Sequence, residues 1–363
     1  MHQVIEIRTL EDFDKLSQLL DDSYNPAIVA AKLKQNVGPA CRAVLIEQPY
    51  VDKDYRSTYY HFYAKKGYRY ESSCARLHFF DDALELGPGL LLRSKGRVLA
   101  DSYMGYMVLR PTRLATIGRT VVSPGLINGF HGSVIAHRHP VHVLGVRLEA
   151  KGFPYMEQHT DISVCAHVAC WAILRHYSER FRRYAEFLTY DVTRMAHEFD
   201  PGGLLPSKGL QLAHAERIFA AAGTYPMVIA KDANTGLFFR QLYAYVESGF
   251  PIFAALYDHE HAIAVVGHGE TLPTPHSPAP AYFAGDLLKG LVVVDDNYLP
   301  YLAIDNSSAS PYKVEDIDAF IVPLPEKVYY SAEAVDDFSA LLASGDFLGF
   351  DHSHLGAPVI RYF

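Results

Sequence analysis

The sequence predicts an α+β protein built from two domains. Nearly half of its 363 residues are hydrophobic, at 49%, which supports sizeable buried cores. Strand-like and helix-like segments mix in the first half, whereas the second half places its helices first and a run of short apolar strands after them. That order is typical of α+β folds and differs from βαβ alternation. The turn-forming KGFP stretch near residue 150 indicates domains of residues 1–150 and 151–363.

Hydrophobic periodicity predicts the elements of the first domain. They are a helix over 9–21 capped by Thr9, a strand over 43–46, a Tyr-rich helix over 52–66, strands over 76–80 and 103–109, and alternating strand pieces within 134–148. The tyrosines between Tyr55 and Tyr70 have two explanations, because each ring is apolar and carries a polar tip. They pack a helix onto a sheet, or they form an interface for a partner.

The second domain is expected to contain helices over 163–184, 191–199, 207–222 and 237–246, followed by strands over 251–256, 261–266 and 291–294. A proline-rich loop separates the last two strands. The first of these helices is apolar on every side from Val164 to Leu174, which is typical of a helix buried at the centre of a fold.

Charge and composition exclude several classes of function. The chain has 33 basic and 41 acidic residues, for a formal net charge of −8, and its longest basic run, Arg180 to Arg183, lies on an expected helix. This argues against a nucleic-acid partner. There is no apolar run of membrane-spanning length and no secretory signal. Four scattered cysteines do not form a disulfide framework, so we expect a reducing, cytoplasmic setting.

Cys165 stands at the start of the buried helix. Unpaired backbone N–H groups and the positive end of the helix dipole favour a thiolate at such a position. Downstream, His261 opens the apolar strand HAIAVVG, and Asp295 closes the strand LVVVD. Gln158 precedes the cysteine in a polar loop.

This order of Gln, Cys, His and Asp over residues 155–323 resembles the papain-like cysteine peptidases, closest to the C39-like branch of bacterial double-glycine peptidases. The resemblance implies a papain-like fold for the second domain, with Cys165 as nucleophile, His261 as base, Asp295 as the acid that orients it and Gln158 in the oxyanion hole. It implies a thiol hydrolase or acyltransferase acting on a peptide, isopeptide or amide carbonyl of a protein or peptide substrate, with no cofactor and no metal. The gap from Gln158 to Cys165 is one residue longer than the family's usual spacing.

Each role in this site has an alternative. Cys170, five residues further along the same helix, points in a different direction from Cys165. His259 and His268 lie close to His261 in sequence. Asp296 and Asn297 follow Asp295 directly, and since successive strand residues face opposite sides, only one of the two aspartates is expected to reach the base.

Two other functions compete with the thiol enzyme. Histidine clusters at 137–142, 259–261 and 351–354 indicate a metal site, although they lack the helical spacing of zinc peptidases. The other possibility is an inactive papain-like scaffold whose Tyr-rich first domain binds a protein partner. The first domain resembles no known family, and the oligomeric state is left open.

Overall fold

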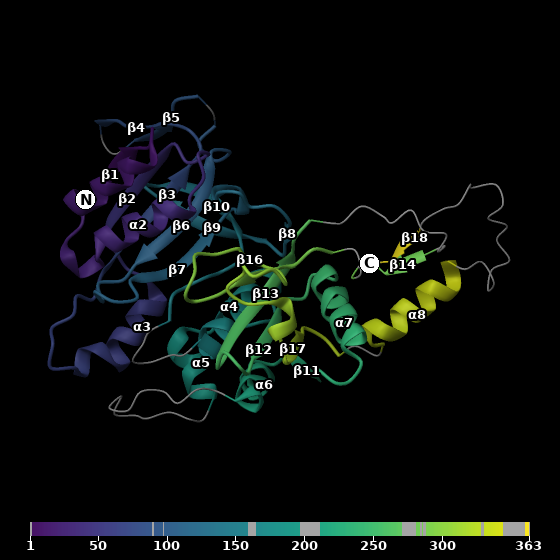
Figure 1. Cartoon of the computed structure of the whole chain (residues 1–363). Coiled ribbons are helices and arrows are strands. Elements are labelled where there is room, and N and C mark those ends of the chain that lie inside the picture. The colour runs from purple at the N-terminus through teal and green to yellow at the C-terminus, as the bar shows by residue number, and fades with distance from the viewer. Residues whose placement is uncertain are drawn as a thin grey trace. The chain divides into compact units, whose positions relative to one another are not determined.

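The structure is a computed structural model. It describes residues 2–88, 91–96, 98–158, 165–196, 211–270, 281–283, 285, 288–327, 330–343 and 360–362, and every structural statement below concerns these residues. The predicted α+β class is confirmed, because helices accompany several antiparallel sheets (Figure 1). No described helix combines the length and the apolarity needed to span a membrane.

The chain divides into two compact units that do not coincide with domains 1–150 and 151–363. Unit 1 comprises 1–130, 136–222 and 294–302, and unit 2 comprises 131–135, 223–293 and 303–363. The buried helix expected to open the second domain therefore lies in unit 1.

Unit 1 is built on a five-stranded antiparallel sheet. Its strands, in spatial order, are β1 (His2–Glu6), β2 (Ala43–Tyr50), β3 (Cys74–Phe80), β6 (Tyr103–Leu109) and β7 (Ile117–Val122). Every residue of β3 and β6 is buried, including Arg76 and His78 on β3. Two hairpins accompany this sheet, β4 (Leu84–Leu86) with β5 (Leu92–Ser94) and β9 (His137–Val143) with β10 (Val146–Gly152).

The helices of unit 1 partly match the predicted ranges. They are η1 (Leu10–Lys15), α1 (Leu16–Leu19), η2 (Asp22–Tyr24), α2 (Pro26–Asn36), α3 (Lys53–His61), η3 (Tyr63–Lys65), η5 (Pro124–Leu126), α4 (Cys165–Arg180), α5 (Thr189–Met195) and α6 (Leu212–Ala221). The segment expected as one helix over 9–21 is mostly 3-10 helix. The first residues of the helix expected over 207–222, up to residue 210, lie outside the described residues.

The Tyr-rich segment packs against the unit 1 core. Tyr55 and Tyr63 are buried in the hydrophobic cluster, and Tyr59 and Tyr70 pack against it. The ring centroids of Tyr55 and Tyr63 are 5.9 Å apart, and those of Tyr63 and Tyr70 are 4.5 Å apart. Aromatic pairs at such separations add to the free energy of area burial. The packing explanation therefore accounts for these four rings, while Tyr60 and Tyr68 remain exposed.

Helix α4 is buried on all sides from Ala166 to Tyr177, as its apolar sequence predicts. It carries one charged residue into this interior, Arg175, whose side chain is 1% exposed. The Arg175 guanidinium donates to both carboxylate oxygens of Asp54 on α3, at 3.0 and 3.1 Å, and Trp171 Nε1 donates to the same carboxylate at 3.0 Å. This buried network ties α3 to α4.

Unit 2 contains most of a seven-stranded sheet. The strand order is β11 (Tyr225–Ala230), β17 (Ala319–Leu324), β12 (Ile252–Leu256), β13 (His261–His268), β15 (Leu291–Val294) and β16 (Leu302–Ile304), with β8 (Ser133–Val134) pairing to β13. The expected strands over 251–256, 261–266 and 291–294 are confirmed. The remaining elements are α7 (Thr235–Glu247), η7 (Val314–Asp316), α8 (Ala332–Ala343) and the parallel pair β14 (Ala281–Phe283) and β18 (Ile360–Tyr362).

The segment between β15 and β16 belongs to unit 1, and Tyr301 hydrogen-bonds to two other segments of that unit. This side chain is 3% exposed, and its hydroxyl accepts the backbone N–H of Phe153 at 2.8 Å and donates to the carbonyl of Val122 at 2.7 Å. Both partners belong to unit 1, so a segment distant in sequence completes its backbone hydrogen bonds.

The pairing of β8 with β13 depends on the absence of a side chain at Gly267. A Cβ atom there would lie 1.9 Å from the carbonyl oxygen of Ser133 and 3.0 Å from Cα of Val134. We expect Gly267→Ala to lower the free energy of unfolding by about 1–3 kcal/mol through overpacking, as measured by urea denaturation. Gly236→Ala is the matched control, because the nearest atom to its Cβ lies 3.9 Å away. Equal stability of the two variants would contradict this account.

Candidate functional site

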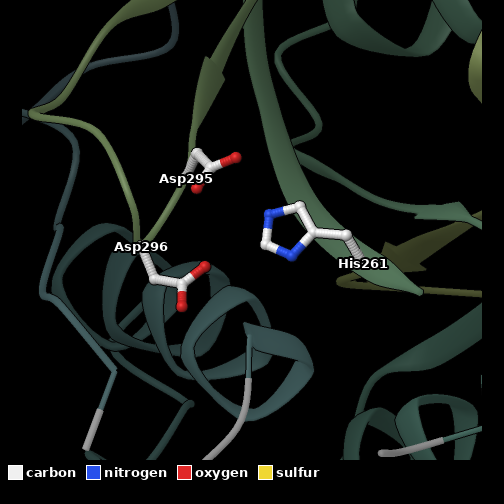
Figure 2. Close-up of side chains that lie close together, drawn as sticks. All are labelled: His261, Asp295 and Asp296. Carbon is white, nitrogen blue, oxygen red and sulfur yellow. The ribbon is translucent and has the colours of Figure 1, made fainter. Parts of the chain in front are cut away.

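His261 and Asp295 lie close together at the ends of two neighbouring strands of the seven-stranded sheet. His261 is the first residue of β13, and Asp295 directly follows β15, the neighbouring strand. Pairing of the two strands in one sheet brings these residues together. A ring nitrogen of His261 and one carboxylate oxygen from each of Asp295 and Asp296 lie within 4.8 Å of one another. Figure 2 shows both carboxylates beside the imidazole.

The local structure restrains both members of the pair. Asp295 is 1% exposed, and its Oδ1 accepts the backbone N–H of Asn297 at 2.7 Å in the turn after β15. The His261 ring stacks on the Tyr312 ring, with centroids 5.4 Å apart and planes inclined by 27°. The aromatic face of Tyr312 therefore limits the orientation of the imidazole.

The neighbouring histidines have other partners. His259 Nε2 lies 3.0 Å from a carboxylate oxygen of Asp316. His268, at the far end of β13, is buried, and its Nε2 lies 2.5 Å from a carboxylate oxygen of Glu247. Of the three histidines that the sequence offered as the base, His261 is the one beside Asp295 and Asp296.

Cys165 differs from the other three cysteines in its environment. It is partly exposed at the first residue of α4, whereas Cys41, Cys74 and Cys170 are buried. Burial raises the pKa of Cys41 to about 12 and raises the pKa values of Cys74 and Cys170 well above the usual range. A thiolate, the reactive form of cysteine, is thus disfavoured at Cys170, the alternative nucleophile.

The remaining predicted site residues are described only in part. Gln158 is partly exposed, and residues 159–164, which connect it to Cys165, lie outside the described residues. Its role in an oxyanion hole stays a prediction. The side chain of Asn297 is exposed, and its backbone rather than its amide contacts Asp295.

Asp296 is where the structure corrects the sequence interpretation. Alternation along a strand led us to expect that one of the two aspartates would face away from His261, but both carboxylates approach the imidazole. Strand β15 ends at Val294, and the chain turns at Asp296, so strand alternation no longer applies to these residues. Asp296 is 5% exposed.

His261, Asp295 and Asp296 also form the one grouping of potential metal ligands found in the described part of the chain. One imidazole and two carboxylates match the ligand types of zinc and non-haem iron sites. The histidines of 137–142 lie on β9 and do not join such a grouping, and residues 351–354 lie outside the described residues.

The chemistry open to this arrangement is proton transfer. An imidazole held by a buried carboxylate acts as a general base, and the carboxylate stabilises the imidazolium formed when the base takes a proton. Comparison with known proteins adds no assignment, since no family model, curated protein or solved structure matches the chain.

Proposed function

We propose that the chain is a thiol-dependent hydrolase or acyltransferase in which Cys165 is the nucleophile, His261 the base and Asp295 the orienting acid. The convergence of His261 and Asp295 at the ends of neighbouring strands carries this proposal. Cys165 supports it, because it is the cysteine that is not buried and it opens a helix of 16 residues.

In the proposed reaction, His261 takes the proton of the Cys165 thiol, and the thiolate attacks a carbonyl carbon of a peptide, isopeptide or amide. The carbonyl oxygen becomes an oxyanion, which the backbone N–H of Cys165 and the amide of Gln158 stabilise. His261 then protonates the leaving amine, and a thioester acyl-enzyme forms. Water or another nucleophile attacks this thioester and releases Cys165.

The pH dependence of Cys165 alkylation tests the proposal without a known substrate. Iodoacetamide reacts with the thiolate, so pairing with His261 is expected to extend fast alkylation of Cys165 below the usual thiol pKa of about 8.5. We expect His261→Ala to slow alkylation near pH 6 by at least about 10-fold and Asp295→Ala to slow it less. Mass spectrometry of the modified cysteine gives the rate.

His259→Ala is the matched control, because His259 is two residues away and bonds to Asp316 instead. It is expected to leave the alkylation profile unchanged. An ordinary thiol profile in the unmodified chain, insensitive to His261→Ala, would contradict the thiol mechanism and favour the inactive scaffold. Loss of Cys165 reactivity on adding zinc, with stoichiometric zinc bound through His261, would favour a metal site at His261, Asp295 and Asp296.

A further inference from the structure

Unit 1 contains a pocket that shares no residue with the candidate catalytic site. Its volume is about 250 Å³, and it lies among α3, α4 and strands β2, β3, β6, β7 and β9. Four cationic side chains line it, contributed by segments far apart in sequence: Lys53, Arg76, Arg119 and Arg175. The one acidic residue in its lining is Glu179.

Two of the arginines are held in place by carboxylates that do not line the pocket. Arg76 donates from Nε to Glu47 at 2.8 Å and stacks on the Tyr50 ring, with Cζ 4.0 Å from the centroid. Arg119 pairs with Asp52 at 3.1 Å and donates to the Tyr50 hydroxyl at 3.2 Å. Buried contacts fix these guanidinium groups before any ligand arrives, which lowers the entropic cost of binding.

Some polar atoms of the lining residues have no hydrogen-bond partner within the described part of the chain. These are Nε of Arg119, Nε of Arg175 and Nε2 of His139. His139 is 4% exposed, and a buried polar atom without a partner costs free energy unless a ligand or a water satisfies it. All three atoms are almost inaccessible to solvent, so the pocket is lined by other atoms of these residues.

His139 contributes a neutral imidazole to the pocket lining. Burial lowers its pKa to about 3, and the positive charges of His137 and Arg119 contribute, so the ring is neutral at physiological pH. The ring also donates a hydrogen bond to the backbone of Gly152. Because Nε2 has no partner, that bond uses Nδ1, and Nε2 of the neutral ring accepts a proton donor.

Each of the four lining cations has a carboxylate partner outside the lining: Glu186 for Lys53, Glu47 for Arg76, Asp52 for Arg119 and Asp54 for Arg175. The cations nevertheless act on one another across the pocket. The pKa of Lys53 is lowered, first by burial and then by the charges of Arg175 and Arg119. An anion in the pocket relieves this repulsion among cations.

We propose that the pocket binds a phosphate group, free or esterified to a small organic moiety. Guanidinium and ammonium groups contributed from several directions suit a tetrahedral dianion better than a planar carboxylate. The pocket is smaller than typical drug-sized sites of roughly 300–1,000 Å³, so the organic part is small.

Isothermal titration calorimetry on the full chain tests this assignment with inorganic phosphate, phenyl phosphate and benzoate. We expect saturable binding of at least one phosphate probe and weaker binding of benzoate. Preference for inorganic phosphate identifies the free ion as ligand, and preference for phenyl phosphate identifies an ester. Absence of saturable binding for both phosphate probes, or benzoate binding as tight as that of phenyl phosphate, would overturn the proposal.

Variants that remove either a positive or a negative charge from the lining test whether the phosphate binds in this pocket. Arg119→Gln is expected to weaken phosphate binding by at least about 10-fold. The half-exposed Lys53→Gln, which carries less risk to folding, is expected to weaken it by about 3-fold, and Glu179→Gln to strengthen it by a similar factor. Arg138→Gln is the control, because its side chain is 75% exposed on β9. Binding that none of the three lining variants changes would place the anion elsewhere and overturn the proposal.

Discussion

Cys165→Ala is expected to abolish covalent labelling by a peptidyl vinyl sulfone probe and to lower any amide turnover by at least about 10³-fold, since the nucleophile is removed. Cys170→Ala is expected to keep the labelling, because Cys170 is 0% exposed and its pKa is raised well above the usual range. Gel fluorescence with a tagged probe measures both variants side by side.

Exposure gives this comparison a second, independent readout. Under native conditions, iodoacetamide is expected to modify Cys165 alone, and after unfolding it is expected to modify all four cysteines, since Cys41, Cys74 and Cys170 are buried. Peptide mapping assigns each label. Probe labelling that survives in Cys165→Ala and disappears in Cys170→Ala would reverse the assignment of the nucleophile.

The largest loss of stability is expected from Asp54→Ala. Asp54 is 3% exposed and accepts hydrogen bonds from Arg175 and from Trp171 Nε1. Its removal leaves the buried Trp171 N–H without this acceptor, and leaves Arg175 with Glu186 and the Phe187 carbonyl as its remaining partners in the described part of the chain. Breaking a buried ion pair on one side typically costs about 3–5 kcal/mol. Urea denaturation followed by tryptophan fluorescence measures this cost at the α3–α4 contact, because Trp171 is the single tryptophan of the chain.

Two further variants distinguish the loss of the buried network from the effect of removing a carboxylate in general. Asp14→Ala removes a carboxylate from an exposed pair with Lys34 and is expected to cost less than about 1 kcal/mol. The double variant Asp54→Leu with Arg175→Met is expected to recover much of the stability, because an apolar pair of similar volume carries no desolvation cost. A loss below about 1 kcal/mol for Asp54→Ala would show that the network contributes little.

Local patterns predicted the elements that surround the candidate site. The apolar run from Val164 to Leu174 predicted the burial of α4, and the runs opening at His261 and closing before Asp295 predicted β13 and β15. β11 was not predicted, because its sequence YPMVIA contains a proline and its residues are exposed or half-buried, which weakens the strand signal. The approach of Asp296 to His261 depends on where the strand stops, which alternation alone does not encode.

The cationic pocket could not be predicted from the sequence, because its residues are not neighbours along the chain. The longest basic run in the sequence is Arg180 to Arg183, and none of the four cations that line the pocket belongs to it. The pocket collects single residues such as Lys53, Arg119 and Arg175 from distant segments, and the sheet topology brings them together. The formal net charge of the chain, −8, also gives no indication of a local cluster of cations.

The hydroxyl of Tyr301 has a consequence for how this protein can be produced in parts. A fragment that stops at residue 222 omits the 294–302 stretch and leaves the amide of Phe153 and the carbonyl of Val122 unsatisfied. Cutting at residue 150 would additionally remove Phe153 and Trp171. A fragment meant to contain all of unit 1 therefore has to include residues 294–302.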